Sequence, residues 1–461
     1  MTAARTPAPR PPLTSGQAEH RLVLLTATRW LPVGLVFGLT VLLPLERGLT
    51  LAQVGALLSI QGFVVLGLEL PTGGLADALG RRPLLIVSGV IAVASTALML
   101  AASTFWMFAV AMVLQGVFRA LDSGPLEAWY VDAAYAHDAR HSIERGLSRA
   151  SMVLGGSIAV GALAGGALVA WQPFGGWSAL ALPFAVSCVL YATHTVLLAV
   201  LVREHRGAQR VAAAGRDGRA SVRRRRGAGV TDALRAAPRT VLQGVGLLRR
   251  SPVLRALVLV EVFWSVAMIA FETLTPVQLA DELGGEDAAA ALFGPASAAA
   301  WGLFAVGALL AGVASRRIGV ARTAMLLRVL NGLFVVGMGV AAGPAGLIVG
   351  YWLAYLTHGS AGPMHSALLH REASPANRAV VLSTNSMVSG GAYSLGLLVL
   401  TPLAGATSPG VALVVAGAFS VLGAALYVPA WRRERERMRV AGRAGAEVAP
   451  AGVTDGGEAR G

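Results

Sequence analysis

The sequence is poor in charged residues, has one cysteine and contains no lysine. Charged residues make up 13% of the 461 positions, which is about half their share in a typical soluble domain. The single cysteine, Cys188, has no second thiol with which to form an internal disulfide or a thiolate metal cluster. These shortages argue against a soluble fold and against a disulfide scaffold, and we expect neither a metal nor a cofactor.

Long apolar runs take the place of the missing charge. Hydrophobic residues account for 55% of the chain, and the mean hydropathy is +0.65. A helix that crosses a bilayer needs about 20 mostly apolar residues. Runs of this kind lie at residues 22–44, 51–72, 83–103, 105–128, 146–170, 177–202, 253–276, 290–312, 321–342, 344–366, 378–402 and 408–430. The sequence therefore predicts an all-α polytopic membrane protein with twelve transmembrane helices.

The arginines predict the orientation of the chain in the membrane. The formal net charge is +14, and the arginines gather in both tails, in a central polar segment and in alternate connections. Cytoplasmic connections of membrane proteins are rich in basic residues, so we expect both termini to be cytoplasmic and the chain to lie in the cell membrane. The four arginines at 223–226 then mark a cytoplasmic loop near anionic lipid and not a nucleic-acid interface.

The chain divides into two similar halves. "SGPLEAW" at 123–129 and "AGPMHSA" at 361–367 lie 238 positions apart, and "SMVLGGS" at 151–157 and "SMVSGGA" at 386–392 lie 235 apart. We expect a cytoplasmic tail (1–21), a six-helix bundle (22–203), a basic loop (204–252), a second six-helix bundle (253–430) and a second cytoplasmic tail (431–461). A pseudo-two-fold axis along the membrane normal would relate the bundles, with a binding site where they meet.

The segment "GGLADALGRRPLL" (73–85) interrupts the apolar pattern between the second and third runs. Asp77 lies at the membrane boundary, where a carboxylate needs an arginine or a helix N-terminus to balance its charge. Gly80 can adopt the left-handed conformation that ends a helix. Arg81 and Arg82 can reach the membrane surface and pair with nearby acids. Such a cluster can latch one half of the protein against the other.

This segment resembles the signature of the major facilitator superfamily, to which Gly73, Leu75, Asp77, Gly80, Arg81, Arg82 and Leu85 conform. "ELPTG" before it and "FRALDSGPLEAWYVD" further on are similar to bacterial drug-efflux members of that family. The resemblance implies that Asp77 pairs with the start of the eleventh span. It also implies that Arg81 pairs with an acid at the inner end of the fourth, for which Asp132 is our candidate. Arg316 replaces the aspartate in the second half, so we expect an asymmetric latch.

Ionisable residues inside apolar runs are candidate functional positions, because placing them in a membrane is costly. Arg29 and Glu69 lie at similar depths in the first and second runs and could pair. Arg119 lies where the family often has an arginine linked to proton transfer. Asp122 and Glu127 follow it by one and two helical turns. Both a structural pairing with Arg119 and a role in transport remain open for these two acids.

The seventh run contains two acids. Glu261 and Glu272 are eleven residues apart, which predicts that they lie near one face of a helix. A carboxylate in a low-dielectric environment can exchange protons near neutral pH, so either residue is a candidate for proton coupling. Arg328 in the ninth run could compensate one of them. Trp264 and Phe271 could line a cavity for apolar ligands.

The pattern favours proton-coupled export of a small amphipathic or cationic compound, such as an antibiotic or a metabolite, by alternating access. Uptake of a sugar, organic acid or amino acid is the alternative within transport. A membrane enzyme or a receptor is a further alternative, but the sequence has no H-E-x-x-H, G-x-S-x-G or phosphate loop. His358, His365 and His370 lack a recognised metal spacing and are interpreted as structural. The expected partners are a small-molecule substrate, protons and the lipid bilayer, with the chain a monomer.

Overall fold

The computed structural model describes residues 13–138, 141–173, 176–203, 241–374 and 377–447, without the side chains of 70–71, 73–78 and 441–447. Within these ranges the backbone is helical apart from short connections. The four arginines at 223–226, residues 1–12 of the first predicted tail and residues 448–461 of the second lie outside the described residues. The side chain of Asp77 lies outside them too.

In the part of the first half that the structure describes there are eight helices: α1 (Ser15–Leu35), α2 (Leu39–Glu46), α3 (Leu51–Leu79), α4 (Arg81–Ala101), α5 (Phe105–Asp122), α6 (Pro125–His137), α7 (Glu144–Trp171) and α8 (Ala181–Leu201). The first predicted span is broken between α1 and α2, and the fourth is broken between α5 and α6. Gly124 has the left-handed backbone (φ 89°) that separates the latter two helices, and Pro125 then begins α6.

The second half repeats this order. Its elements are α12 (Pro252–Ile269), η1 (Ala270–Leu274), α13 (Thr275–Leu283), α14 (Glu286–Ile318), α15 (Val320–Val340), α16 (Gly343–Glu372), α17 (Arg378–Ala406), α18 (Pro409–Leu422), η2 (Gly423–Tyr427) and α19 (Val428–Glu447). The seventh predicted span corresponds to α12, η1 and α13 together. The twelfth corresponds to α18, η2 and the first residues of α19.

Among the described residues, eleven helical stretches are long and apolar enough to cross a membrane. The predicted tenth span, 344–366, is not one of them, although it lies within the 30-residue helix α16. Polar side chains such as Thr357, His358 and Ser360 lower the apolar character of α16. The helix nevertheless packs against both α14 and α15, which puts it in the position of a tenth span. The chain is a multi-pass membrane protein.

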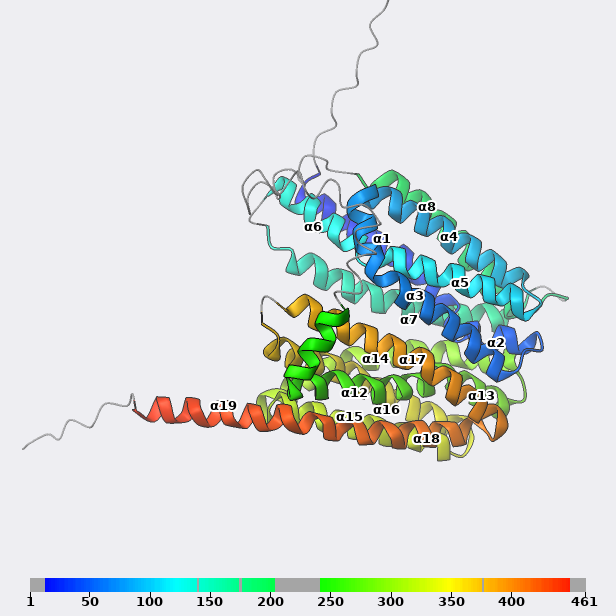
Figure 1. Cartoon of the computed structure of the whole chain (residues 1–461). Helices are drawn as coiled ribbons and strands as arrows, with labels where there is room; N and C mark the ends of the chain where they lie inside the picture. The colour runs from blue at the N-terminus through cyan, green and yellow to red at the C-terminus, as the bar shows by residue number, and fades with distance from the viewer. Residues whose placement is uncertain (1–12, 139–140, 174–175, 204–240, 375–376, 448–461) are drawn as a thin grey trace, which may run out of the picture.

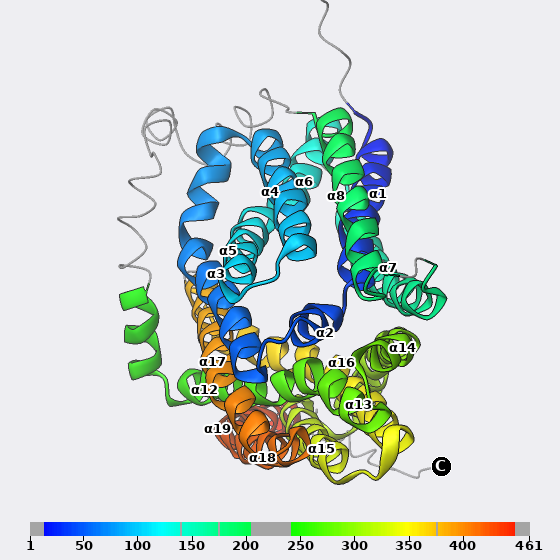
Figure 2. The same ribbon diagram turned by 90° about the vertical axis from the view of Figure 1, so that its right-hand side faces the viewer.

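The helices form two groups, α1–α8 and α12–α19 (Figure 1). We call the end that holds Arg81, Arg82, Arg149 and Arg371 the arginine-rich end, and the end that holds Glu46, Asp281, Glu282, Glu286 and Asp287 the acidic end. The groups converge toward the acidic end and diverge toward the arginine-rich end, from which α19 projects. Figure 2 looks along the bundle from the acidic end, and α2 lies there between the two groups.

Glycines permit close contact between the groups. A Cβ on Gly294 of α14 would lie 2.6 Å from the carbonyl oxygen of Ala162 and 2.7 Å from Cα of Gly166, both in α7. α3 and α17 form the second long contact between the halves, and Ser59 donates a hydrogen bond of 2.8 Å to the carbonyl of Ser394 there. Small residues thus bring the backbones of the two halves together, as they do in other membrane helix pairs.

Arginine side chains satisfy the carbonyls that helices leave free at their ends. At the acidic end, Arg47 donates to the carbonyls of Met99 (3.1 Å), Leu100 (2.8 Å) and Ala102, where α4 ends. At the arginine-rich end, Arg82 donates to the carbonyl of Ala199 near the end of α8 (2.7 Å). These contacts fix the helix ends around the central space.

Candidate functional site

A cavity of about 1070 Å³ lies between the two halves and is lined by α1, α3, α5 and α7 on one side and by η1 and α17 on the other. Its wall at the arginine-rich end includes the exposed residues Glu127, Leu382 and Ser386. At the far end Phe37 stacks on Phe293 of the other half, with ring centroids 6.0 Å apart. The cavity is therefore reached from the arginine-rich end.

A buried ion pair forms part of the wall. Arg29 Nε lies 2.5 Å from the carboxylate of Asp122, and the guanidinium carbon lies 4.2 Å from the ring centroid of Phe118. The predicted pairing of Arg29 with Glu69 is wrong. The break after α5 places the Asp122 carboxylate beside α1, whereas Glu69 accepts a hydrogen bond from Ser386 of α17 (2.9 Å).

Arg119 and Glu272 face the cavity from opposite halves. Arg119 lies one turn before Asp122 and its side chain is exposed to the cavity. It interacts electrostatically with Glu272 and with Tyr393 of the second half. Asp122 is bound by Arg29, so of the two alternatives left open for Asp122 a structural pair with Arg119 is not found among the described residues. Glu127 lies exposed at the mouth.

Glu272 lies on the π-helical turn η1, a rare conformation that is often found at functional sites. Pro276 follows four residues later and has no N–H to bond the carbonyl of Glu272, so the regular hydrogen-bond pattern cannot continue there. The wider turn shifts the register of the helix. Glu272 and Thr273 consequently line the cavity, and Thr273 lies 3.4 Å from the hydroxyl of Tyr393.

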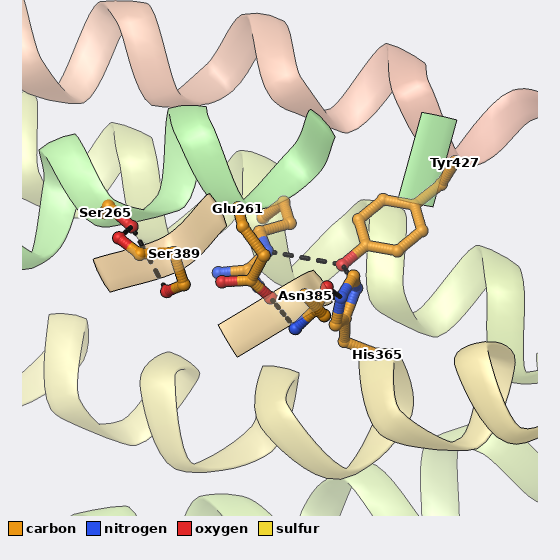
Figure 3. A network of polar contacts seen from close by, with 7 residues as sticks. Glu261, Ser265, His365, Asn385, Ser389 and Tyr427 are labelled. Atoms are coloured by element: carbon orange, nitrogen blue, oxygen red, sulfur yellow. Dashed lines mark hydrogen bonds and ion pairs between the residues drawn. The ribbon is translucent and has the colours of Figure 1, made fainter. Parts of the chain in front are cut away.

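Glu261 does not share this face, which corrects the prediction from the eleven-residue spacing. Its carboxylate lies 3.0 Å from His365 Nε2 and accepts a hydrogen bond of 3.3 Å from Asn385 (Figure 3). His365 Nδ1 lies 2.9 Å from the hydroxyl of Tyr427. Glu261 and His365 are buried, and Asn385 separates them from the cavity that it also lines.

Arg328 belongs to this buried network. Its guanidinium carbon lies 3.7 Å from the ring centroid of Trp264, and its Nε donates to the hydroxyl of Tyr427 (3.4 Å). It interacts electrostatically with Glu261, as expected. Trp264 and Phe271, which the sequence offered as candidates for the cavity wall, are both buried in an aromatic cluster with His358. Trp301 is an aromatic residue of the second half that does line it.

Each half carries an ion pair between its first helix and its fourth span, and the two pairs have opposite polarity. The first helix of the first half supplies the base Arg29 and its fourth span supplies the acid Asp122. In the second half the first helix supplies the acid Glu261, which is 232 positions after Arg29. The fourth span supplies His365, which is 243 positions after Asp122.

The sequence interpretation took His365 as structural and did not predict its contact with Glu261. The 238-residue offset of the repeat makes His365 the counterpart of Glu127 and Ser360 the counterpart of Asp122. Its alignment with the acid Glu127 is the signal that could have pointed to His365.

The signature segment lies at the arginine-rich end. Arg81 lies 2.5 Å from the carboxylate of Asp132, and Arg81 also donates to the carbonyl of Ala128. The expected contact between Arg81 and Asp132 is thus present. The backbone of Gly73, Leu75 and Asp77 is helical within α3. The partner of Asp77 and the function of the segment as a latch stay predictions.

Potential metal ligands do not gather in the described part of the chain, where no group of three or more histidine, cysteine or acidic residues is found. His358 stacks on Trp264 and His365 contacts Glu261, so the two histidines belong to different contacts.

Two halves of packed helices around a charged central cavity define a membrane transporter. The chain belongs to the Major Facilitator Superfamily, whose family model matches residues 22–357. It is a transporter and not an enzyme. No curated protein matches the chain.

Solved structures of transporters have the same fold. The nucleoside transporter NupG is 12% identical, with a TM-score of 0.69 over 90% of this chain and 99% of that one. A proton dependent oligopeptide transporter is 14% identical, with a TM-score of 0.64 over 91% of this chain and all of that one. The human organic anion transporter MFSD10 is 17% identical, with a TM-score of 0.57 over 91% of this chain and all of that one. At these identities the likeness establishes the fold alone.

Proposed function

We propose that this chain is a secondary transporter that exports a small amphipathic cation from the cytoplasm in exchange for protons. The charge of the cavity carries the proposal. Its described lining contains two arginines and four acids, a formal balance of two negative charges: Arg29, Arg119, Glu69, Asp122, Glu127 and Glu272. Such a lining attracts positive charge.

Aromatic rings in the same wall suit the apolar part of such a substrate. Trp30, Trp301 and Tyr393 line the cavity with the acids. A cation over an aromatic face gains about 0.5–2 kcal/mol, depending on its exposure to water. A compound with a cationic group and an apolar body can therefore contact acids and rings at once.

Glu272 is the proposed site of proton coupling. It is a cavity acid on the second half, and Arg119 faces it from the first half. A proton on Glu272 removes the negative charge that a cationic substrate needs. Proton and substrate would therefore compete for this carboxylate, which is the condition for exchange.

The proposed orientation supports the proposed direction of transport. We place the arginine-rich end and both termini in the cytoplasm, because basic residues concentrate on that side of the membrane. The cavity is open at this end, so a cytoplasmic compound can enter it. The proposed membrane is the plasma membrane, and the proposed functional unit is the monomer.

Proton-coupled uptake is the second candidate. The similarity to NupG and to a proton dependent oligopeptide transporter over about nine-tenths of the chain favours it. Uptake would move substrate and protons in the same direction, whereas the proposed exchange moves them in opposite directions.

Proteoliposomes with an internal pH dye and an imposed pH gradient test the proposal with a panel of cationic dyes and antibiotics. We expect a cation to drive proton movement in the opposite direction, and we expect this response to be lost in Glu272→Gln. Asp287→Asn, which removes an exposed acid from the acidic end of the same half, is the matched control and should respond normally. Co-movement of proton and substrate would establish uptake instead, and absence of any proton response to the panel would refute the proposal.

A further inference from the structure

The second half contains a contact at its arginine-rich end that the signature resemblance does not predict. We propose that Glu434 of α19 is a positioning residue that completes a second latch, in which the polarity of the first latch is reversed. The proposal rests on alternating-access transport but does not depend on the substrate or on protons.

The internal repeat places the two latches at equivalent positions. Gly80 (φ 93°, ψ 156°) precedes α4 and Gly319 (φ 89°, ψ 158°) precedes α15, so the two turns share one backbone conformation 239 positions apart. The same offset takes Arg81 to Val320 and Asp132 to Arg371. The base of the first latch is therefore missing from the second, and its acid is replaced by a base.

Glu434 supplies what the second latch lacks. Its carboxylate accepts hydrogen bonds from the backbone N–H groups of Val320 (3.2 Å) and Ala321 (3.0 Å) at the start of α15. Arg371 near the end of α16 donates to the same carboxylate at 2.7 Å. Two contacts stabilise the negative charge of this carboxylate: the free N–H groups at the start of the helix and the positive charge of the arginine.

The surroundings hold this carboxylate in place. A Cβ on Gly319 would lie 3.1 Å from Glu434 Oε2, so a larger residue there would displace it. Arg433, next to Glu434, and Arg437, one turn further along α19, both bind Glu372, which is the last residue of α16. α19 thereby ties the start of α15 to the end of α16.

In the first half, the ion pair between Arg81 and Asp132 joins the start of α4 directly to α6. In the second half the part of α19 that extends beyond the predicted twelfth span makes the connection. The function of Glu434 is to keep these two helix ends together while the second half moves as one body.

Spin labels test this without a substrate. In a Cys188→Ser background, cysteines at Ser151 and Leu382 place one label on each half at the mouth, where both residues are exposed. We expect Glu434→Gln to broaden the distance distribution, because the amide loses the charge-assisted hydrogen bond to Arg371 and the favourable charge at the start of α15. Glu436→Gln, an exposed acid on the same helix, is the matched control.

Rescue distinguishes a latch from general destabilisation. Adding Val320→Arg and Arg371→Asp to Glu434→Gln rebuilds the arrangement of the first half and should restore the narrow distribution. Failure of this rescue, or a Glu434→Gln variant that behaves like the parent, would overturn the proposal. If Glu434→Gln does not fold, Arg371→Gln keeps the helix cap and should broaden the distribution to a smaller extent; an unchanged distribution would overturn the proposal equally. Because the labels report conformation alone, failure of the export proposal leaves this test intact.

Discussion

Asn385 and Ser386 are adjacent in α17, and their side chains bind carboxylates that belong to different halves of the protein. Asn385 donates to Glu261 within its own half, whereas Ser386 donates to Glu69 of α3 in the other half. One turn of α17 therefore joins the buried Glu261–His365 pair to a contact between the halves. A change at either carboxylate acts on the same short segment.

We expect Ser386→Ala to shift the balance between conformations at the arginine-rich end. A typical hydrogen bond contributes about 0.5–1.5 kcal/mol, which corresponds to a shift of about two- to tenfold in an equilibrium. Distances between spin labels at Ser151 and Leu382 measure that shift. Ser389→Ala is the control, because the Ser265 hydroxyl still donates to the Ser389 carbonyl within one half. Equal distributions for the two variants would contradict this expectation.

We expect Glu261→Gln to destabilise the protein strongly. Removing one partner of a buried ion pair costs about 3–5 kcal/mol, since the remaining partner loses its compensation. The double variant Glu261→Gln with His365→Gln should cost less than the sum of the single changes. Thermal unfolding in detergent measures this, with the exposed Glu127→Gln as a control expected within about 0.5 kcal/mol of the parent. Additive effects of the two changes would show that the pair is not coupled.

We expect Pro276→Ala to impair transport without unfolding the protein. Alanine supplies an N–H at position 276, which a regular α-helix bonds to the Glu272 carbonyl, so the π-helical turn can become regular and turn Glu272 away from the cavity. The expected loss is about tenfold or more in proton-coupled flux, which is the effect of displacing a positioned group. Pro409→Ala, in the first turn of α18, frees no such bond and is the control. Full flux in Pro276→Ala would argue against the need for the turn.

We expect Gly294→Val to favour a conformation open at the acidic end. Its side chain would enter the contact with Gly166 in α7, and an overpacked contact costs about 1–3 kcal/mol. Spin labels at Ser103 and Asp287, exposed on opposite halves at that end, should move apart. Gly302→Val in the same helix meets open space and is the control. An unchanged distance in Gly294→Val would indicate that α7 and α14 part without resistance.

The number and order of the spans were accessible from the sequence because a bilayer imposes a length and a composition on every helix that crosses it. The duplication was visible because corresponding turns of the two halves keep a glycine, as Gly80 and Gly319 do. The contact of Arg81 with Asp132 followed from the signature segment. α16 shows that an apolar composition is an imperfect signal for a membrane span. Neighbouring helices shield α16 from lipid, so it can carry polar side chains and still lie among the spans.

The pairing of charges inside the bundle was less accessible. Arg29 pairs with Asp122 and not with Glu69, because the choice depends on helix rotation and on the break after α5. Glu261 and Glu272 separate because a single wide turn before Pro276 changes the register of everything beyond it. Periodicity extrapolates a regular helix and therefore fails where the helix is irregular, which is where the cavity acid lies.

The contact of Arg47 has a consequence for the order in which the chain assembles. The three carbonyls that bind this guanidinium belong to the end of α4, which is synthesised after it. When the first two spans enter the bilayer, Arg47 has Glu46 beside it but lacks these three carbonyls. The contact can form only when the third span is in place. A chain that ends before residue 99 would therefore lack the hydrogen bonds that join Arg47 to the end of α4.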